Sequence, residues 1–203
     1  MEIYLIRHGE CYNSTIEYYD AEKKTMNPPL TYKGMMQAEK LAVRCKTIGF
    51  DMIISSDLLR AVQTAEKIKI VTSCEFSTTP AFREIDMGAI YVKSWDNYPD
   101  LYAQWVLHNQ DLPYPDGENG EDIWSRCKTQ LESLIATHNK KIAIVCHGGT
   151  IRSIICGVLG IPQQKRFYLG LLLENCSISI IRYSEKEKRF YLHTFNDFSH
   201  ISG

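Results

Sequence analysis

The chain has 203 residues, 44% of them apolar and 23% charged, and its formal net charge is -1. This length suits a single domain with a sizeable core, so we expect one domain over residues 1–203. The near-neutral charge leaves no basic excess for nucleic acid. No apolar run approaches the roughly 20 residues of a membrane-spanning helix, so we expect neither nucleic acid nor membrane as a partner.

The first residues and the cysteines indicate a compartment. The short apolar run Ile3–Ile6 is followed by charge, whereas a secretory signal has a basic start and a longer apolar region. The seven cysteines are spread singly, and their odd number leaves at least one without an internal partner. We therefore expect reduced thiols, a cytoplasmic location and, in the absence of ligand-spaced clusters, no metal or other cofactor.

Strand-like and helix-like segments alternate along the chain. In the first half, composition and periodicity predict a strand over Glu2–Ile6, a helix over Thr31–Ile48, a strand over Asp51–Ser55, a helix from Ser56 to about Lys69, and a weaker strand over Cys74–Thr78. In the second half they predict a helix over Glu121–His138, a strand over Lys141–Cys146, a helix over Thr150–Leu159, and a terminal strand pair, Cys176–Tyr183 and Arg189–Phe195. We expect Thr31 to cap the first helix, and Ser56 and Asp57 to start the second.

This alternation predicts an α/β fold, specifically a three-layer α/β/α sandwich with a mostly parallel central sheet. The segment 86–120 is too long for a plain connection, so we expect an inserted cap, or functional loops with a helix inside. Four of its aromatic residues recur at helical spacing: Trp95, Tyr98, Tyr102 and Trp105. We expect this stripe mainly to pack a cap helix onto the body, with one or two rings lining the pocket as the alternative.

Two of the predicted strands end in histidine and glycine, as Arg7-His8-Gly9 and as His147-Gly148-Gly149. Ligands of open α/β sheets bind at the carboxyl ends of strands. A helix that begins after the second motif would aim its amides at the same place, which suits an anion. One histidine at a strand end is more often a hydrogen-bonded core residue. Two in matching contexts, with an arginine that needs an anionic partner, favour an anion site.

Two further motifs follow or flank strands but are ordinary when taken alone. Arg60 lies one turn into the predicted second helix, where an arginine is more often a surface residue. Glu84 and Asp86 form a carboxylate pair in the turn Phe82–Gly88. Neither motif by itself predicts a function.

Taken together and in this order, the motifs resemble the histidine phosphatase superfamily, the phosphoglycerate-mutase-like proteins. The resemblance is carried by Arg7-His8-Gly9-Glu10, the helix start Leu30–Glu39, the block Ser55–Ala65, the block Arg83–Gly88, His147-Gly148-Gly149 and the closing Asn196–His200. Arg-His-Gly alone would be weak evidence, but all the blocks in order are specific and span the chain.

The resemblance implies that the protein is a phosphatase acting on a small phosphorylated substrate. It implies that His8 is the nucleophile, that Arg7, Arg60 and His147 bind the phosphoryl group, and that Glu84 donates the proton. Phosphoryl transfer spreads negative charge over the equatorial oxygens. Two guanidiniums and an imidazolium fixed in advance can match that charge without a metal. The resemblance therefore predicts a metal-independent enzyme.

The chain departs from the family pattern at three places. Family members often carry an asparagine six residues after the nucleophile. Here Ser14 holds that place and Asn13 precedes it, so we expect one of them to contact phosphate, together with Gly148. The turn Gly88–Val92 replaces an aromatic-acid-glycine turn, which predicts a different substrate mouth. Asp57 replaces a common proline, although it still suits a helix start. Apart from these departures, Asp86 competes with Glu84 as the acid, and Glu84 is preferred by motif alignment only.

Three functions remain as hypotheses. The first is hydrolysis of a phosphomonoester of a small metabolite. The substrate stays open among phosphosugars, phosphoglycerate-like acids, phosphoserine, a nucleotide-loop phosphate such as α-ribazole phosphate, and phosphoproteins. The second is a mutase, although phosphoglycerate mutases carry a longer Arg-His-Tyr-Gly-type block that this chain lacks. The third is a silent binding module, which the complete set of site residues disfavours. The histidines His108, His138 and His193 are expected to be bystanders, and His200 to lie near the site without a role.

Overall fold

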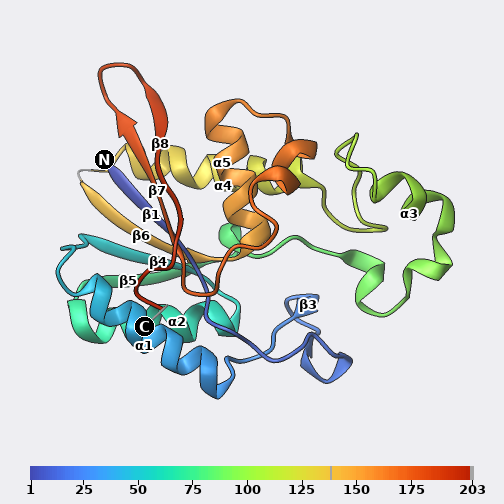
Figure 1. The fold of residues 1–203 in the computed structure, drawn as a ribbon, viewed down its shortest axis with the longest axis horizontal. Helices are drawn as coiled ribbons and strands as arrows, with labels where there is room; N and C mark the ends of the chain where they lie inside the picture. The colour runs from blue at the N-terminus through green and yellow to red at the C-terminus, as the bar shows by residue number, and fades with distance from the viewer. Residues whose placement is uncertain (138, 202–203) are drawn as a thin grey trace.

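The computed structural model describes residues 1–137 and 139–201, and its centre is a six-stranded sheet in the order β5-β4-β6-β1-β7-β8 (Figure 1). The strands are β1 (Glu2–Arg7), β4 (Met52–Ser56), β5 (Glu75–Thr79), β6 (Lys141–Cys146), β7 (Ile178–Ser184) and β8 (Arg189–Asp197). The first four run parallel, and β7 and β8 add an antiparallel edge. The sheet is therefore mixed and mostly parallel, as predicted.

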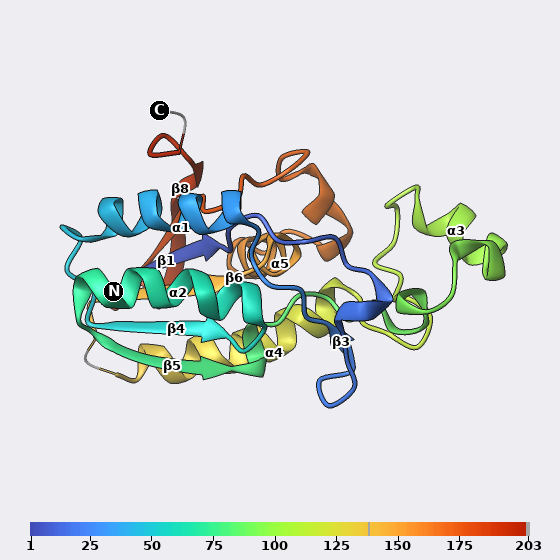
Figure 2. The ribbon, with the colours of Figure 1, turned by 90° about the horizontal axis from the view of Figure 1, so that it is seen from below.

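Helices cover both faces of the sheet. Figure 2 shows α1 (Tyr32–Cys45) and α2 (Leu59–Thr72) on one side, and α4 (Gly120–Ile135) on the other. The helix α5 (Gly148–Leu159) packs beside α4. Because side chains alternate along a strand, Ile3 and Leu5 of β1 face α4 and α5, whereas Tyr4 and Ile6 face α1 and α2. The predicted three-layer sandwich is confirmed.

The first two helices begin differently. Thr31 caps α1, as predicted, because its Oγ1 accepts from the Gly34 amide at 3.0 Å. That helix ends at Cys45, three residues before the predicted end. The prediction that Ser56 and Asp57 start α2 was wrong, because the residue at the N-cap is Leu58.

The other two long helices begin slightly earlier than predicted. A capping box between Asn119 and Asp122 starts α4. The predicted end of this helix, His138, lies outside the described residues. The helix α5 begins at Gly148, directly after His147, so both glycines lie in its first turn rather than before it.

Residues 86–119 lie to one side of the sheet and carry only short elements (Figure 1). These are η3 (Gly88–Tyr91), η4 (Trp95–Asn97) and α3 (Pro99–Trp105). The smaller elements elsewhere are η1 (Ile16–Tyr18), β2 (Tyr19–Asp20), β3 (Thr25–Met26), η2 (Pro80–Phe82) and η5 (Gln163–Tyr168).

The aromatic residues of this segment do not form one helical stripe. Trp95 belongs to η4, whereas Tyr102 and Trp105 belong to α3. The Trp95 ring centroid lies 5.2 Å from that of Tyr102 and 5.4 Å from that of Trp105. Trp105 also reaches Phe167 of η5 at 5.6 Å. The rings therefore form a local cluster, rather than one helical stripe, and Trp105 and His108 connect it to Phe167 of the body.

Among the described residues, no helix is both long enough and apolar enough to cross a membrane.

Candidate active site

Neighbouring strands bring the two histidines together. β1 and β6 are parallel and in register, with Arg7 opposite Cys146. His8 and His147 follow directly, and their ring centroids are 5.1 Å apart. Their side chains are buried, with exposed fractions of 6% for His8 and 0% for His147. Two strand ends thus place both rings in one buried group, as the sequence predicts.

The hydrogen bonding of His8 defines which nitrogen is free. Its Nδ1 lies 2.7 Å from the carbonyl oxygen of Gly9. Because a carbonyl can only accept, Nδ1 carries the hydrogen, and the lone pair of the neutral ring is at Nε2. Burial holds the pKa of His8 well below its ordinary value, and the nearby charges of Arg60 and Arg7 lower it further. His8 is therefore neutral, with Nε2 available as a nucleophile.

His147 differs from the imidazolium expected from the sequence. Burial lowers its pKa well below the ordinary value, and Arg60, His8, Arg126 and Arg7 lower it further. Its Nε2 lies 2.9 Å from the hydroxyl of Ser56, and its Nδ1 is buried with no hydrogen-bond partner among the described residues. Burial, together with the surrounding positive charges, therefore favours the neutral ring of His147.

Two arginines supply the positive charge. Arg60 is 7% exposed in the first turn of α2 and donates to the carbonyl of Met26 at 3.1 Å. Arg7 donates from Nη1 to the carbonyl of Leu173, whereas its buried Nε has no hydrogen-bond partner in the described part of the chain. A buried guanidinium without an anionic partner is costly. The group therefore favours the binding of an anion.

The two candidate acids lie in different surroundings. Glu84 approaches the start of α5, where its Oε2 accepts from the Gly149 amide at 3.2 Å. Its Oε1 accepts from the Ile85 amide at 3.0 Å. The Oδ1 of Asp86 instead accepts from the Gly88 amide at 2.8 Å, within its own turn. This arrangement favours Glu84 over Asp86 as the group nearer to the histidines.

The remaining residues predicted to contact phosphate are Asn13, Ser14 and Gly148, and they lie in different surroundings. Asn13 and Ser14 are exposed in the connection after β1, rather than within the buried group. Gly148 lies beside Arg7: a Cβ at this position would be 3.6 Å from the Arg7 Nε. The first turn of α5 is thus close to Arg7, whereas the exposed Asn13 and Ser14 are not part of the buried group.

Several residues that hold the Glu84 segment in place were missed from the sequence. Arg83 and Asp57 form a bidentate ion pair, with distances of 2.7 Å from Nε and 2.6 Å from Nη2. Arg126 of α4 binds both carboxylate oxygens of Glu118. Arg126 also donates to the carbonyls of Ala81, Arg83 and Glu84. An arginine on the polar face of a predicted helix resembles a solvated residue, so no local pattern identifies this role.

Another missed contact holds the backbone of His8. The Asn175 side chain and the Cys176 amide both donate to the His8 carbonyl, at 3.1 and 3.2 Å. His200 does not contact His8 directly in this arrangement. Its Nε2 lies 3.0 Å from the carbonyl of Cys176, whose amide binds the His8 carbonyl. The segment before β7 therefore fixes the backbone on which His8 sits.

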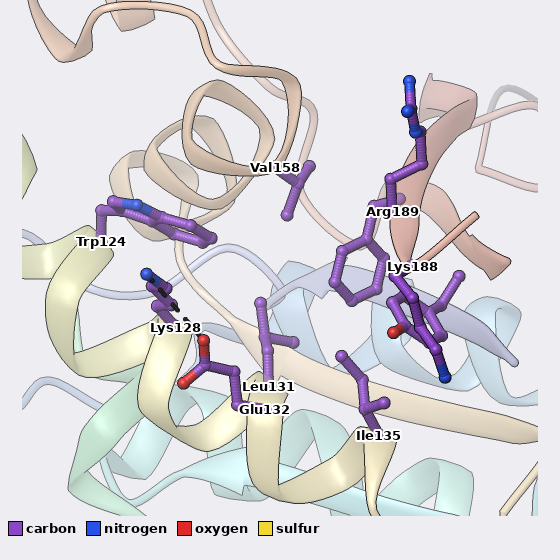
Figure 3. Close-up of a pocket in the computed structure, with 10 residues that line it drawn as sticks. Trp124, Lys128, Leu131, Glu132, Ile135, Val158, Lys188 and Arg189 are labelled. Carbon is purple, nitrogen blue, oxygen red and sulfur yellow. Dashed lines mark ion pairs between the residues drawn. The ribbon is translucent and has the colours of Figure 1, made fainter. Parts of the chain in front are cut away.

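The hollow in Figure 3 lies at the end of the sheet opposite to the two histidines. Its volume is about 420 Å³, and its floor is apolar, formed by residues such as Leu131, Ile135 and Val158. Lys188 and Arg189 border it at the hairpin between β7 and β8. Because β7 is antiparallel to β1, this hairpin lies near the start of β1, whereas the histidines follow its end. The hollow is separate from the candidate site.

The two buried histidines predict a pH dependence of stability. Because folding lowers both pKa values, the unfolded chain binds protons below a pH of about 6.5 that the folded chain does not bind. The free energy of unfolding should therefore fall as the pH drops below 6.5. Each of the two histidines contributes at most about 1.4 kcal/mol to this fall for every pH unit. Denaturant unfolding should show a shallower fall for His147→Gln than for the wild type. Equal slopes would contradict the lowered pKa of His147.

Comparisons with known proteins identify a family and a similar protein. Residues 3–197 match the model of the histidine phosphatase superfamily (branch 1). The chain is 33% identical over 193 residues to a probable phosphoglycerate mutase GpmB from Enterobacter sp. (strain 638), covering 91% of this chain and 86% of that protein.

Two solved structures have the same fold. Phosphoserine phosphatase from Entamoeba histolytica, in complex with phosphoserine, aligns with a TM-score of 0.80 at 25% identity, covering 98% of both chains. Mycobacterial glucosyl-3-phosphoglycerate phosphatase, in complex with inorganic phosphate, aligns with a TM-score of 0.80 at 21% identity, covering 99% of both chains.

Proposed function

The chain belongs to branch 1 of the histidine phosphatase superfamily, and from this premise we propose that it hydrolyses a small phosphomonoester through a phosphohistidine on His8. The observation that carries the proposal is the neutral His8 ring, whose free Nε2 shares a buried group with Arg7 and Arg60. Such a nitrogen can attack phosphorus, and the guanidiniums can hold the phosphoryl oxygens. The substrate is thus recognised first by its phosphate.

In the first displacement, His8 Nε2 forms a bond to phosphorus while the bond to the leaving oxygen breaks. Arg7 and Arg60 balance the charge that spreads over the equatorial oxygens. The leaving oxygen takes a proton from the carboxyl of Glu84. The products of this step are the free alcohol and a phosphohistidine.

In the second displacement, water attacks the phosphohistidine. Glu84, now a carboxylate, accepts a proton from that water, and the bond between phosphorus and Nε2 breaks. His147 contributes during both steps, because a bound phosphoryl dianion raises the pKa that burial and the arginines lower. The neutral ring of the ligand-free site thereby becomes a cationic donor when phosphate binds.

The proposed mechanism obtains its positive charge from side chains alone. Arg7, Arg60 and the protonated His147 together supply the charge that a metal ion supplies in many other phosphoryl-transfer enzymes. Chelators should therefore leave turnover unchanged, and strong inhibition by EDTA would contradict metal independence.

A mutase is the second candidate function. It is supported by the 33% identity to a protein named a probable phosphoglycerate mutase. A mutase returns the phosphoryl group to a bound intermediate, whereas a phosphatase passes it to water. The chain lacks the longer Arg-His-Tyr-Gly-type block of phosphoglycerate mutases after Glu84, and this absence supports hydrolysis.

The experiment that tests the proposal measures phosphate release in EDTA from a panel of phosphomonoesters. The panel contains phosphoserine, 3-phosphoglycerate, phosphosugars and α-ribazole 5'-phosphate, and a parallel assay follows the isomerisation of 3-phosphoglycerate. We expect phosphate release without isomerisation, and the ranking of the panel identifies the substrate class. Isomerisation without release would replace the proposal with the mutase.

Replacing Glu84 with glutamine should slow turnover selectively. A poor alkoxide leaving group needs the proton of Glu84, whereas p-nitrophenolate leaves without one. We expect Glu84→Gln to lower kcat by about 10²-fold on an alkyl phosphate and by less than about threefold on p-nitrophenyl phosphate. Asp86→Asn is the matched control and should keep the wild-type ratio. Equal losses on both substrates with Glu84→Gln would contradict its role as the acid.

A further inference from the structure

The helix α5 begins with two glycines, Gly148 and Gly149, although glycine is a poor helix former. Alanine would favour the helix at both positions, so the presence of glycine needs another reason. Neither residue has a positive φ, since the glycines of the described chain with positive φ are Gly49, Gly88, Gly160 and Gly170. The reason must therefore lie in what surrounds the first turn.

The space around the two glycines differs sharply. A Cβ on Gly149 would lie 2.4 Å from Glu84 Oε1 and 3.2 Å from Glu84 Cδ. On Gly148 it would meet nothing closer than 3.6 Å, an ordinary contact with Arg7. A separation of 2.4 Å between non-bonded carbon and oxygen is strongly repulsive. A Cβ at position 149 would therefore displace the Glu84 carboxyl, the end of a flexible side chain, whereas a Cβ at position 148 would make only an ordinary contact.

The backbone of Glu84 cannot readily move away from such a clash. The Glu84 carbonyl accepts from Arg126 at 3.2 Å. The preceding carbonyl, of Arg83, accepts from both Arg126 and the hydroxyl of Thr150. Thr150 belongs to α5 itself, so the Glu84 segment and the start of the helix are tied together. Only the Glu84 side chain is free to rotate, and rotation would break its bond to the Gly149 amide.

We propose that Gly149 is a positioning residue for Glu84. The missing side chain leaves room for the carboxyl, and the amide of the same residue holds Oε2 at 3.2 Å. This inference rests on the proposed function, because it gives Gly149 its effect only through the proton that Glu84 transfers. It also explains why a helix that would fold better with alanine starts with glycine at this position.

Gly149→Ala tests the proposal because it separates helix stability from proton transfer. We expect kcat on an alkyl phosphate to fall about tenfold or more, and kcat on p-nitrophenyl phosphate to fall less than about threefold. The change in melting temperature should not account for the loss of kcat on the alkyl phosphate. In the Glu84→Gln background, the further Gly149→Ala change should leave the ratio of the two rates unaltered, because the donated proton is already absent.

A matched control lies in the same helix. A Cβ on Gly157 would come within 2.1 Å of the Trp124 ring, which borders the hollow in Figure 3, away from the candidate site. Gly157→Ala therefore disturbs α5 by a similar clash without contact to Glu84. We expect it to lower the melting temperature and to keep the wild-type ratio of rates on the two substrates.

The outcomes distinguish the inference from the proposed function. If Glu84→Gln changes the ratio and Gly149→Ala does not, the positioning role of Gly149 is wrong while Glu84 remains the acid. If Gly157→Ala changes the ratio as much as Gly149→Ala does, the effect is a general one of helix damage and the inference fails. If Glu84→Gln itself leaves the ratio unchanged, the acid assigned in the proposed function is wrong, and the inference fails with it.

Discussion

His8→Ala should lower phosphate release by about 10⁴-fold or more, because it removes the atom that accepts the phosphoryl group. The remaining residues could still bind phosphate through Arg7 and Arg60, so vanadate binding should persist. The fold should also persist, because the hydrogen bonds that tie residue 8 to β6 and to the segment before β7 come from its backbone. Steady-state phosphate release and circular dichroism measure the two effects separately.

The control for this substitution is another histidine of the chain. His193 is exposed on β8, so His193→Ala makes the same chemical change at a position remote from the group. We expect it to leave phosphate release unchanged. Activity of His8→Ala near that of His193→Ala would contradict His8 as the nucleophile.

The second large effect is expected from Arg60→Ala. Removing a fixed donor that faces developing charge typically costs 10²–10³-fold, and we expect about 10³-fold in kcat/KM because Arg60 is buried and a guanidinium keeps its charge in proteins. The loss should extend to binding, so vanadate should inhibit less strongly. Arg60→Lys should fall between wild type and alanine, since lysine keeps the charge but not the planar fork.

An exposed arginine gives the matched comparison. Arg44 lies on the surface of α1, and Arg44→Ala should not change kcat/KM. If Arg60→Ala weakened turnover no more than Arg44→Ala does, Arg60 would not belong to the phosphoryl site, and the proposed source of charge would be wrong.

Periodicity was sufficient to predict the layers of the fold, because each buried strand and amphipathic helix carries its own pattern. It failed where a tertiary contact takes a side chain that local rules assign elsewhere. The hydroxyl of Ser56 lies against His147, and the carboxylate of Asp57 pairs with Arg83. Both residues precede the N-cap Leu58, and their side chains make these tertiary contacts instead of capping α2, although both have the right chemistry for a cap.

The prediction that the aromatic residues share one helix was wrong for a local reason. Residues before proline are biased away from the helical conformation, and Tyr98 precedes Pro99 with φ −137° and ψ 51°. The helix α3 therefore begins at Pro99, and Trp95 is left in a separate turn. The spacing from Trp95 to Trp105 was helical, but the chain between them is not one helix.

The sequence was sufficient to predict the part of the candidate site that lies at the ends of strands. His8 and His147 each follow a buried strand, and the parallel register alone brings them together. Arg126 and Asn175 could not be found in this way, because they reach the site from α4 and from the segment before β7. Such contacts depend on how distant segments pack, which leaves no pattern in the neighbouring sequence.

The most direct test of the central claim is to trap the phosphorylated enzyme. Wild-type protein is mixed with a good substrate and quenched under alkaline conditions within one turnover, and the peptides are analysed by mass spectrometry. We predict one added phosphoryl group on the peptide that contains His8, and none in His8→Ala. A phosphoryl group on another residue, or turnover without any phosphorylated intermediate, would contradict the account.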